Sequence, residues 1–448
     1  MSNSGNQLSF PAIGGKEIVA QFNGGRVSSD AGLLLVKQAD SVLGLTAGLS
    51  RCITDDRQQR KVRQSIEDMV RQRVYGIVAG YEDCNDFDTL CSDPLFKVAA
   101  DRMPVTGLDL ASQPTLSRLE NSITAGDLLK MAEYLVQLFI ARHRSAPPAQ
   151  IILDLDATDD PAHGQQELEF YHGYYRTHCF LPLLVYATAD DCEQELLAAV
   201  LRPGNKHAGH GSVSILRRIL PVLREALPGC RFLVRGDAGF ALPTFYNWCE
   251  QAGVEYAISL PKNSRLRELS SDLEQEARAL FAQSQQKVRH FGEIQYAAST
   301  WPGPRRVVVK AEMTAKGYNP RFVVTNLPAH DPALDSAEML YGFYTDRGDI
   351  ENRIKELKID IRSGRTSCHR FLANQFRLML HAAAFILLQA LRALLRNTEA
   401  EAWQAGTIRT KLLKVGALVV ESVRRIAITL PSSYPLQGLW KHLALAYT

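Results

Sequence analysis

The sequence lacks the cysteine patterns that organise disulfide-stapled domains or zinc modules. Its eight cysteines are scattered, none forms a C-x-x-C pair, and no cysteine and histidine array has zinc-finger spacing. This distribution is typical of reduced thiols in an intracellular protein. With 46% hydrophobic and 22% charged residues, the chain is expected to fold around an apolar core.

Long uninterrupted apolar runs are also missing. The opening residues 1–6 contain no basic segment and no apolar segment, so we expect no secretion signal. The most apolar stretch, residues 378–395, contains His381, Gln389 and Arg392, which would be costly in a bilayer. We therefore predict a buried helix there, no membrane partner, and a cytoplasmic, nucleoid-associated protein.

A strong excess of one charge is absent too. The formal net charge is only +3 over 448 residues. This value neither predicts nor excludes a nucleic-acid partner, because an acidic site can offset local basic patches in the sum. The length predicts two or three domains.

Residues 1–149 are predicted to form a mostly helical, DNA-binding region after a short opening segment. Residues 57–80 have apolar side chains at helical spacing together with several arginines and a lysine. This segment is compatible with a solvated basic helix face or with a helix that contacts phosphates. A further short helix is predicted at 112–121.

Residues 150–397 have the alternation of predicted strands and helices that is typical of an α/β domain. Apolar strands are expected at 151–156, 168–172, 179–187, 231–237 and 254–260. Helices are expected at 212–227 and 242–252. This order is that of a ribonuclease-H-like fold, in which a mixed sheet carries flanking helices on both faces.

Alternating segments within this domain predict a β-rich insertion at about 262–336. They lie at 288–296, 305–314 and 321–327. Helices are again predicted over residues 337–397. Residues 398–448 are predicted to form a C-terminal helical and strand extension.

Two predicted strands end in acidic residues. Asp154 and Asp156 fall on one face of the first strand because side chains alternate. Asp156 is the favoured metal ligand because it precedes Ala-Thr where the strand should end, and Asp154 is the alternative. Asp159 and Asp160 are assigned to the following turn. Asp237 lies between two glycines, which mark a turn or permit close approach of a phosphate backbone.

A third acid belongs to a helical pattern after the insertion. Tyr344, Arg347, Glu351 and Lys358 stand at offsets that place them within an arc of roughly 60° on a helix. An exposed salt-bridged face would account for the pair Arg347 and Glu351 alone. It would not require a phenol and an ammonium in line with them.

The spacing Y-x2-R-x3-E-x6-K resembles the motif of a large class of bacterial insertion-sequence DDE transposases. Residues 156–158 (Asp-Ala-Thr) and 235–240 (Arg-Gly-Asp-Ala-Gly-Phe) resemble the two aspartate elements of that class. Asp237 follows Asp156 by 81 residues, and Glu351 follows Asp237 by 114 residues. The longer second gap agrees with the β-strand insertion that members of the class carry there.

This resemblance implies cut-and-paste DNA transposition, with Mg²⁺-dependent cleavage at transposon ends and strand transfer into target DNA. Asp156, Asp237 and Glu351 would ligate two Mg²⁺ ions, for which Mn²⁺ can substitute. Tyr344, Arg347 and Lys358 would hold terminal phosphates. Because two ends must be handled together, a homodimer or higher assembly on transposon-end and target DNA is expected.

Further basic residues follow the Glu351 helix, and their density predicts contacts with the DNA backbone. They are Arg362, Arg365, His369, Arg370 and Arg377. Trp301, in the insertion, is compatible with stacking on a flipped base or with ordinary packing. His207 and His210 fit a loop better than a metal pair.

Two other functions remain compatible with the sequence. One is a ribonuclease-H-like nuclease that cuts DNA without joining it. The other is a catalytically inactive DNA-binding protein derived from a transposase. The intact set of Asp156, Asp237 and Glu351 argues against the second.

Overall fold

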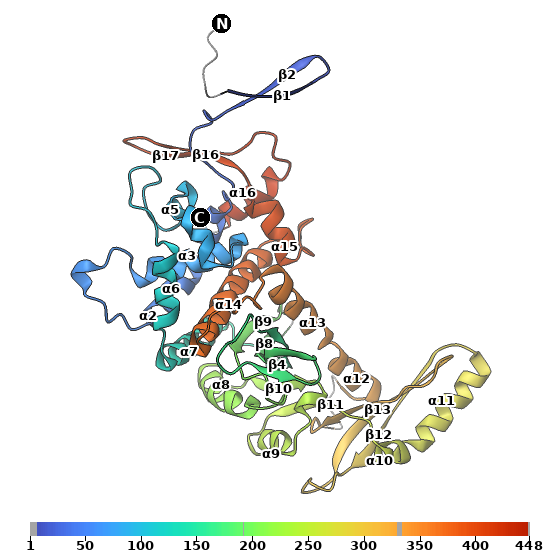
Figure 1. Ribbon diagram of the computed structural model, residues 1–448. Helices are drawn as coiled ribbons and strands as arrows, with labels where there is room; N and C mark the ends of the chain where they lie inside the picture. The colour runs from blue at the N-terminus through green and yellow to red at the C-terminus, as the bar shows by residue number, and fades with distance from the viewer. Residues whose placement is uncertain (1–6, 191, 329–333, 447–448) are drawn as a thin grey trace. The chain divides into compact units, whose positions relative to one another are not determined.

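The computed structural model describes residues 7–190, 192–328 and 334–446. The chain divides into two compact units, and Figure 1 shows their elements. Unit 1 comprises Met1–Ser122 and Ala383–Thr448, and unit 2 comprises Ile123–Ala382. Unit 1 is therefore assembled from two segments that are distant in the sequence.

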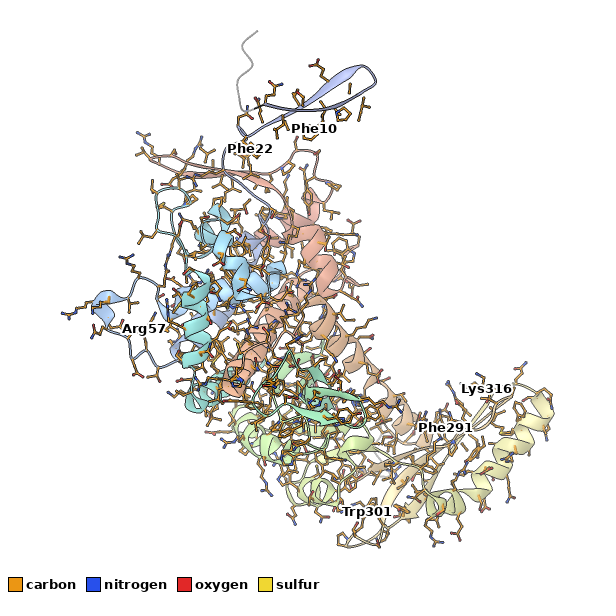
Figure 2. All side chains as sticks on the ribbon, viewed as in Figure 1. Phe10, Phe22, Arg57, Phe291, Trp301 and Lys316 are labelled. Atoms are coloured by element: carbon orange, nitrogen blue, oxygen red, sulfur yellow. The ribbon has the colours of Figure 1, made fainter. Side chains whose placement is uncertain are left out.

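Unit 1 consists of short helices and two small sheets. Its helical elements are α1 (Leu33–Leu43), α2 (Leu45–Arg51), η1 (Gln59–Lys61), α3 (Ile66–Ala79), η2 (Cys84–Asp86), α4 (Phe87–Leu90), α5 (Pro94–Ala99), α6 (Gln113–Ser122), α15 (Ala405–Ile408), η5 (Arg409–Leu413) and α16 (Gln437–Leu445). The first sheet is an exposed hairpin, β1 (Gln7–Ile13) with β2 (Lys16–Gln21), in which Figure 2 labels Phe10.

The second sheet joins the two segments of unit 1. In it β3 (Val27–Ser28) pairs antiparallel with β16 (Ala417–Glu421), which pairs in turn with β17 (Ile426–Thr429). The buried carboxylate of Asp30 receives a hydrogen bond from Lys414 Nζ at 2.6 Å. The helical part of the predicted C-terminal extension is short, because the chain leaves η5 at Leu413 and pairs as β16 from Ala417.

The predicted basic helix at 57–80 is only partly confirmed. Helix α3 begins at Ile66, where the Ser65 hydroxyl accepts a hydrogen bond from the Asp68 amide. Arg57, which Figure 2 labels, precedes the helix. Arg73 is fully buried and pairs with Glu120 at 3.0 Å, so it holds the core together and contacts no phosphate. The helix expected at 112–121 is confirmed as α6.

Unit 2 is built on a mixed sheet with a ribonuclease-H-like core, which confirms the predicted fold class. The core strands are β4 (Gln150–Ala157), β8 (Leu183–Ala189), β9 (Glu195–Val200), β10 (Arg231–Gly236) and β11 (Glu255–Leu260). Their spatial order is β9-β8-β4-β10-β11. Strands β4, β10 and β11 are parallel, and β8 is antiparallel to both of its neighbours.

Two of the expected core strands are corrected by the structure. The segment near 168–172 forms β6 (Phe170–His172), which belongs to a separate small sheet with β5 (Asp160–Pro161) and β7 (Thr177–Phe180). The expected strand at 179–187 is interrupted between β7 and β8. The third core strand is β9, which the sequence analysis missed.

The insertion continues the same sheet and confirms the predicted strands. Strands β12 (Val288–Tyr296) and β13 (Arg305–Thr314) have the expected bounds. Strand β15 (Arg321–Thr325) pairs antiparallel with both β13 and β11. The other elements of the insertion are α10 (Ser264–Leu269), α11 (Ser271–Ser284) and β14 (Gly317–Tyr318).

Different helices cover the two faces of the sheet (Figure 1). Apolar side chains of α7 (Ala125–His143), α8 (Ser212–Ala226) and α9 (Pro243–Gln251) pack with Ile151, Leu153 and Leu155 of β4 on one face. On the other face Ile152 clusters with Leu340 of α12 (Ala337–Thr345). Because side chains alternate along a strand, Asp154 and Asp156 share the face of Ile152.

The helical region after the insertion is segmented rather than continuous. Helix α12 is followed by α13 (Gly348–Lys355), a π-helical turn η4 (Glu356–Asp360) and α14 (Phe371–Ala393). The motif residues from Tyr344 to Lys358 therefore do not lie on one uninterrupted helix. Helix α14 is long and apolar enough to cross a membrane, but 83% of its most apolar window is buried, as predicted for a core helix.

Candidate active site

Asp156 and Asp237 lie side by side at one edge of the sheet. The last residue pair in the register of the parallel strands β4 and β10 is Leu155 with Gly236, so the next residues along both strands are Asp156 and Asp237. Neighbouring strands are roughly 5 Å apart, and aligned residues point to the same face. The carboxyl ends of β4 and β10 thus present two acids to the face covered by α12.

Asp154, the alternative ligand, is held inside the protein. Its carboxylate is fully buried and accepts hydrogen bonds from Arg235 Nε and Nη2, each at 2.7 Å, and from Gln194 at 2.7 Å. Arg235 also donates to the carbonyl of Phe343 at 2.7 Å, at the end of α12. This network attaches α12 to the sheet beside Asp156. It also leaves the Asp154 carboxylate inaccessible to solvent.

Asp156 is partly exposed and is paired with Arg347. Arg347 Nη2 donates to Asp156 Oδ2 at 2.7 Å. Burial raises the pKa of Asp156 to about 6; the Arg347 guanidinium opposes this rise, and the charges of Asp237 and Glu351 add to it. The charges of Asp237 and Glu351 therefore both act on the Asp156 carboxylate.

Asp237 also shapes the turn that follows β10. Its Oδ1 accepts a hydrogen bond from the Gly239 amide at 2.9 Å and caps a 3₁₀ turn, η3 (Ala238–Phe240). A Cβ at Gly239 would lie 2.5 Å from Ala208 Cβ and 3.0 Å from Asp237 Oδ1. The glycine therefore permits the tight turn that orients Asp237.

Glu351 is exposed on the first turn of α13. Among residues 7–190, 192–328 and 334–446, no three acidic, histidine or cysteine side chains lie close enough to hold one metal ion. The donor set still fits a hard divalent cation, because all three groups are carboxylates. The guanidinium of Arg347 bonds to one of the two carboxylate oxygens of Asp156, Oδ2.

Tyr344 lies at the same edge of the sheet. Burial raises the pKa of Tyr344, and the charge of Asp237 raises it further. The charges of Arg347 and Arg321 and a hydrogen bond with Ser259 lower it. Ser259 belongs to β11, the neighbour of β10. The phenol is thus placed between the acidic residues and the insertion.

Lys358 reaches the carboxyl end of β4 from the π-helical turn. Its Nζ donates to Asp159 Oδ1 at 2.6 Å and to Thr158 Oγ1 at 3.1 Å. Asp159, expected to belong only to a turn, thus also pairs with Lys358. No local pattern indicates it, because Asp159 and Lys358 are 199 residues apart in the chain.

The basic residues after Lys358 are not equivalent. Arg362 and Arg365 are exposed, and Arg362 has a positive φ of 56°. Arg377 is buried and donates to the Arg365 carbonyl at 2.9 Å and to Ser367 at 2.6 Å. The guanidinium of Arg377 therefore supports the loop that carries Arg365, and the expectation that some of these basic residues contact the DNA backbone stays a prediction.

The contacts of Trp301, His207 and His210 bear on two further expectations. The Trp301 ring, labelled in Figure 2, makes edge contacts with Tyr246 and Tyr296 and lies 4.9 Å from the Arg305 guanidinium carbon. This favours the packing interpretation of Trp301. His207 and His210 lie in a loop whose carbonyls accept hydrogen bonds from Arg202.

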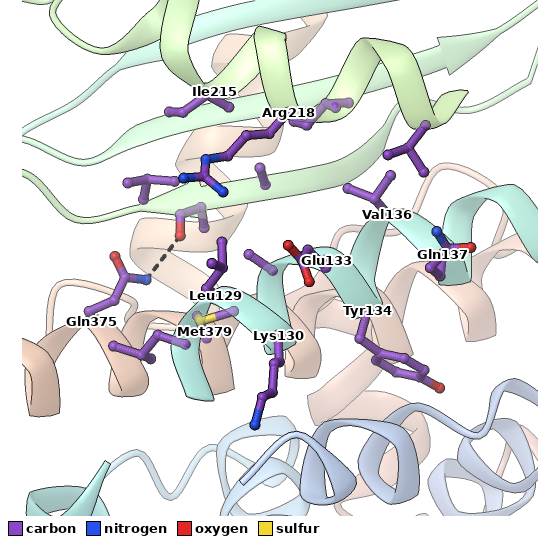
Figure 3. A pocket seen from close by; sticks show the side chains of 17 residues that line it. Leu129, Lys130, Glu133, Tyr134, Val136, Gln137, Ile215, Arg218, Gln375 and Met379 are labelled. Carbon is purple, nitrogen blue, oxygen red and sulfur yellow. Dashed lines mark hydrogen bonds between the residues drawn. The ribbon is translucent and has the colours of Figure 1, made fainter. Parts of the chain in front are cut away.

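Unit 2 also contains a cavity of about 670 Å³ (Figure 3). It is lined by α7, α8, β9 and part of α14, and Gln375 in its wall donates to the Ala199 carbonyl at 3.1 Å. Helices α7 and α8 cover the sheet face opposite Asp156. The cavity is therefore separate from the carboxylates.

Comparison with known proteins identified a family and similar solved structures. Residues 10–447 match the family described as "Transposase DDE domain group 1". A piggyBac transposase, determined by cryo-EM in a synaptic complex with hairpin DNA, is 12% identical over 94% of this chain and 81% of that chain, with a TM-score of 0.42. No curated protein matches the chain.

Proposed function

This chain belongs to the transposase DDE domain group 1 family, and from that premise we propose that it performs cut-and-paste DNA transposition. The proposed reaction is cleavage at transposon ends followed by joining of the freed ends to target DNA. Asp156, Asp237 and Glu351 are the proposed ligands of two Mg²⁺ ions, which Mn²⁺ can replace.

The alignment of Asp156 with Asp237 carries this proposal. Acids at the ends of adjacent parallel strands converge on one edge of a ribonuclease-H-like sheet, and Glu351 contributes to the electrostatic environment of Asp156. Asp154 is fully occupied by Arg235 and Gln194, which supports Asp156 as the first ligand. Bound divalent ions would activate the attacking oxygen and stabilise the leaving one.

The basic and phenolic residues around the acids are proposed to position DNA. Arg347 can bind a phosphate with two parallel hydrogen bonds, and Lys358 offers a point charge. In the described structure Arg347 binds Asp156 and Lys358 binds Asp159. A phosphate that attracts Arg347 would release the Asp156 carboxylate. Tyr344, Arg362 and Arg365 complete the proposed DNA-contacting set.

The proposed partners are transposon-end and target DNA, bound by a homodimer or higher assembly. Joint handling of two ends requires two sites, which is the basis of the assembly proposal. We also propose that residues 1–149 contribute to DNA binding, that 150–397 carry catalysis, and that the protein works in the cytoplasm at the nucleoid.

A strand-transfer assay tests the proposed activity. Wild-type protein, DNA from the borders of the coding region, a target plasmid and Mg²⁺ should give joined products. Glu351→Gln should abolish cleavage and joining, whereas Asp349→Asn, an exposed acid on the same helix turn, should retain both. Cleavage without joining would favour the nuclease, and binding without cleavage would favour an inactive DNA-binding protein.

Calorimetry tests the metal ligands independently of catalysis. Mn²⁺ should bind wild-type protein and bind more weakly to Asp237→Asn, because one of the proposed oxygen ligands is weakened. Asp349→Asn again serves as the control. Equal Mn²⁺ binding by wild type and Asp237→Asn would refute the assignment of Asp237.

A further inference from the structure

The loop between β9 and α8, residues 201–211, begins at the sheet edge that carries the acids. Strand β9 runs in the same direction as β4, because both are antiparallel to β8. At its end Val200 pairs with Leu183, which pairs in turn with Ala157, the last residue of β4. The chain therefore leaves β9 at the end of the sheet where Asp156 lies.

The same loop packs on the turn that orients Asp237. A Cβ at Gly239 would lie 2.5 Å from Ala208 Cβ and 3.0 Å from Asp237 Oδ1. From the loop side, a Cβ at Gly209 would lie 2.7 Å from the Gly239 carbonyl oxygen. Ala208 and the Asp237 carboxylate thus lie on either side of one glycine. Direct packing therefore places the loop beside a proposed metal ligand.

A buried cation holds this loop in place. Arg202 is 5% exposed and donates to the Ala208 carbonyl at 2.7 Å and to the His210 carbonyl at 2.6 Å. A further hydrogen bond joins it to the Leu181 carbonyl at 2.8 Å. With the described residues Arg202 forms no ion pair, and its Nη2 has no hydrogen-bond partner among them. Because buried charges are usually paired, this cation would be compensated by an anion bound at the loop.

The outer side of the loop carries basic side chains and no acid. His207 and His210 are exposed, and Lys206 is half-buried. The Lys206 ammonium has no hydrogen bond or ion pair to any residue within 7–190, 192–328 and 334–446. Residues 196–224 contain no aspartate or glutamate, so no acid of this segment, including the first turn of α8, competes for an anion. The loop is therefore suited to a negatively charged ligand.

We propose that residues 205–211 bind a DNA phosphate close to the bond to be cut, with Lys206 as the principal cation. This inference rests on the proposed transposase function and adds a DNA contact from a segment that holds none of the proposed metal ligands. Because the loop adjoins Asp237 and successive nucleotides of one strand are 3.4 Å apart, the phosphate should lie within about three nucleotides of the cut bond.

Neutral phosphates test this contact. Fluorescence anisotropy measures binding of the full chain to duplexes from the gene border that each carry one uncharged methylphosphonate, without added divalent metal so that the DNA stays intact. At the contacted position the methylphosphonate should weaken wild-type binding about fivefold, the factor expected for a good exposed ion pair. Lys206→Gln should weaken binding of the unmodified duplex by a similar factor and show no further loss at that position.

Arg218→Gln is the matched control. It removes an exposed cation of α8 that lines the cavity shown in Figure 3. Its effect and that of the methylphosphonate should multiply at every position, as expected for independent sites. The same multiplication at every position for Lys206→Gln would overturn the proposal. Coupling of Lys206 only to phosphates more than about three nucleotides from the cut bond would overturn it as well.

The outcome is distinguishable from failure of the proposed function. Cleavage of the unmodified duplex by wild type with Mg²⁺ identifies the cut bond. If wild type cleaves and joins DNA while Lys206→Gln couples to no phosphate, only the loop contact is wrong. If wild type neither cleaves nor joins DNA, the proposed function fails and the position beside a cut bond fails with it. A thermal melt checks that both variants fold, as expected for single substitutions away from the core.

Discussion

Asp154 and Asp156 are two residues apart on one face of β4, and their surroundings give them different roles. Asp154 lies in a closed network with Arg235 and Gln194, whereas Asp156 lies at the sheet edge beside Arg347. The sequence predicted that both acids share a face. It could not rank them by burial, because Arg235 is 81 residues away in the chain.

We predict that Asp154→Asn lowers the free energy of unfolding by about 3–5 kcal/mol, because it leaves the buried Arg235 without a charged partner. Asp156→Asn should cost much less, since burial already raises the pKa of that carboxyl to about 6 and disfavours its charge. Urea unfolding measures both variants. Similar losses for the two would contradict the division of roles.

Asp160 supplies a pH-dependent term in stability. Its buried carboxyl accepts a hydrogen bond from Thr366 at 2.8 Å. Burial raises the pKa of Asp160 to about 7; Thr366 and Lys358 oppose the rise and Asp159 adds to it. Because the folded pKa exceeds the unfolded value, this group stabilises the fold at low pH and loses that contribution as pH rises from about 4 through 7.

Asp160→Asn should therefore stabilise the protein relative to wild type at about pH 8, and the gain should shrink toward pH 4. The asparagine oxygen can still accept the Thr366 hydrogen bond. Urea unfolding at several pH values gives the difference between the two proteins. A gain that does not change with pH would show that Asp160 does not titrate in this range.

At the scale of elements, regular alternation was the most informative pattern. Strands β12 and β13 were predicted with their observed bounds because their alternating residues are intrinsically suited to strands. Strand β9, with the sequence ELLAAV, was missed because alanine and leucine carry no strand preference. Its conformation comes from pairing with β8.

The small sheet of β5, β6 and β7 depends on a close backbone approach at Gly204. A Cβ there would lie 1.9 Å from the carbonyl oxygen of Cys179, in β7. We predict that Gly204→Ala costs about 1–3 kcal/mol and lowers amide protection across β7 in hydrogen exchange.

Gly173→Ala is the matched control for this sheet, because it lies in the turn between β6 and β7 and its Cβ would meet nothing within 4 Å. It should leave exchange in β7 unchanged. Equal effects of the two alanines would show that the close approach at Gly204 does not limit stability.

At the scale of the whole molecule, the domain boundaries predicted from local sequence patterns differ from the boundaries of the compact units. The proposed boundaries near residues 149 and 397 come from changes in the pattern of apolar and polar residues along the sequence. The compact units come from contacts, and unit 1 combines residues before Ile123 with residues after Ala382. Such contacts depend on pairs such as β3 with β16, which no local sequence pattern reveals.

Lys414 is predicted to hold the two segments of unit 1 together. Lys414→Met should lower the free energy of unfolding by about 3 kcal/mol, because Asp30 is then buried without its cation. Lys411→Met, which removes an exposed lysine lying 4.5 Å from the Trp403 ring centre, should cost less than about 1 kcal/mol. Urea unfolding of the full chain compares the two, and equal losses would contradict a special role for Lys414.

The split composition of unit 1 has a consequence for biosynthesis. The ribosome completes every residue of unit 2 before it makes β16, the strand that pairs with β3. At about 5–20 residues per second, the 39 residues that follow Ala382, up to Glu421, require several seconds. The amino-terminal helices of the nascent chain lack their partner strand during that interval, so we expect the sheet of unit 2 to fold first and unit 1 to fold last.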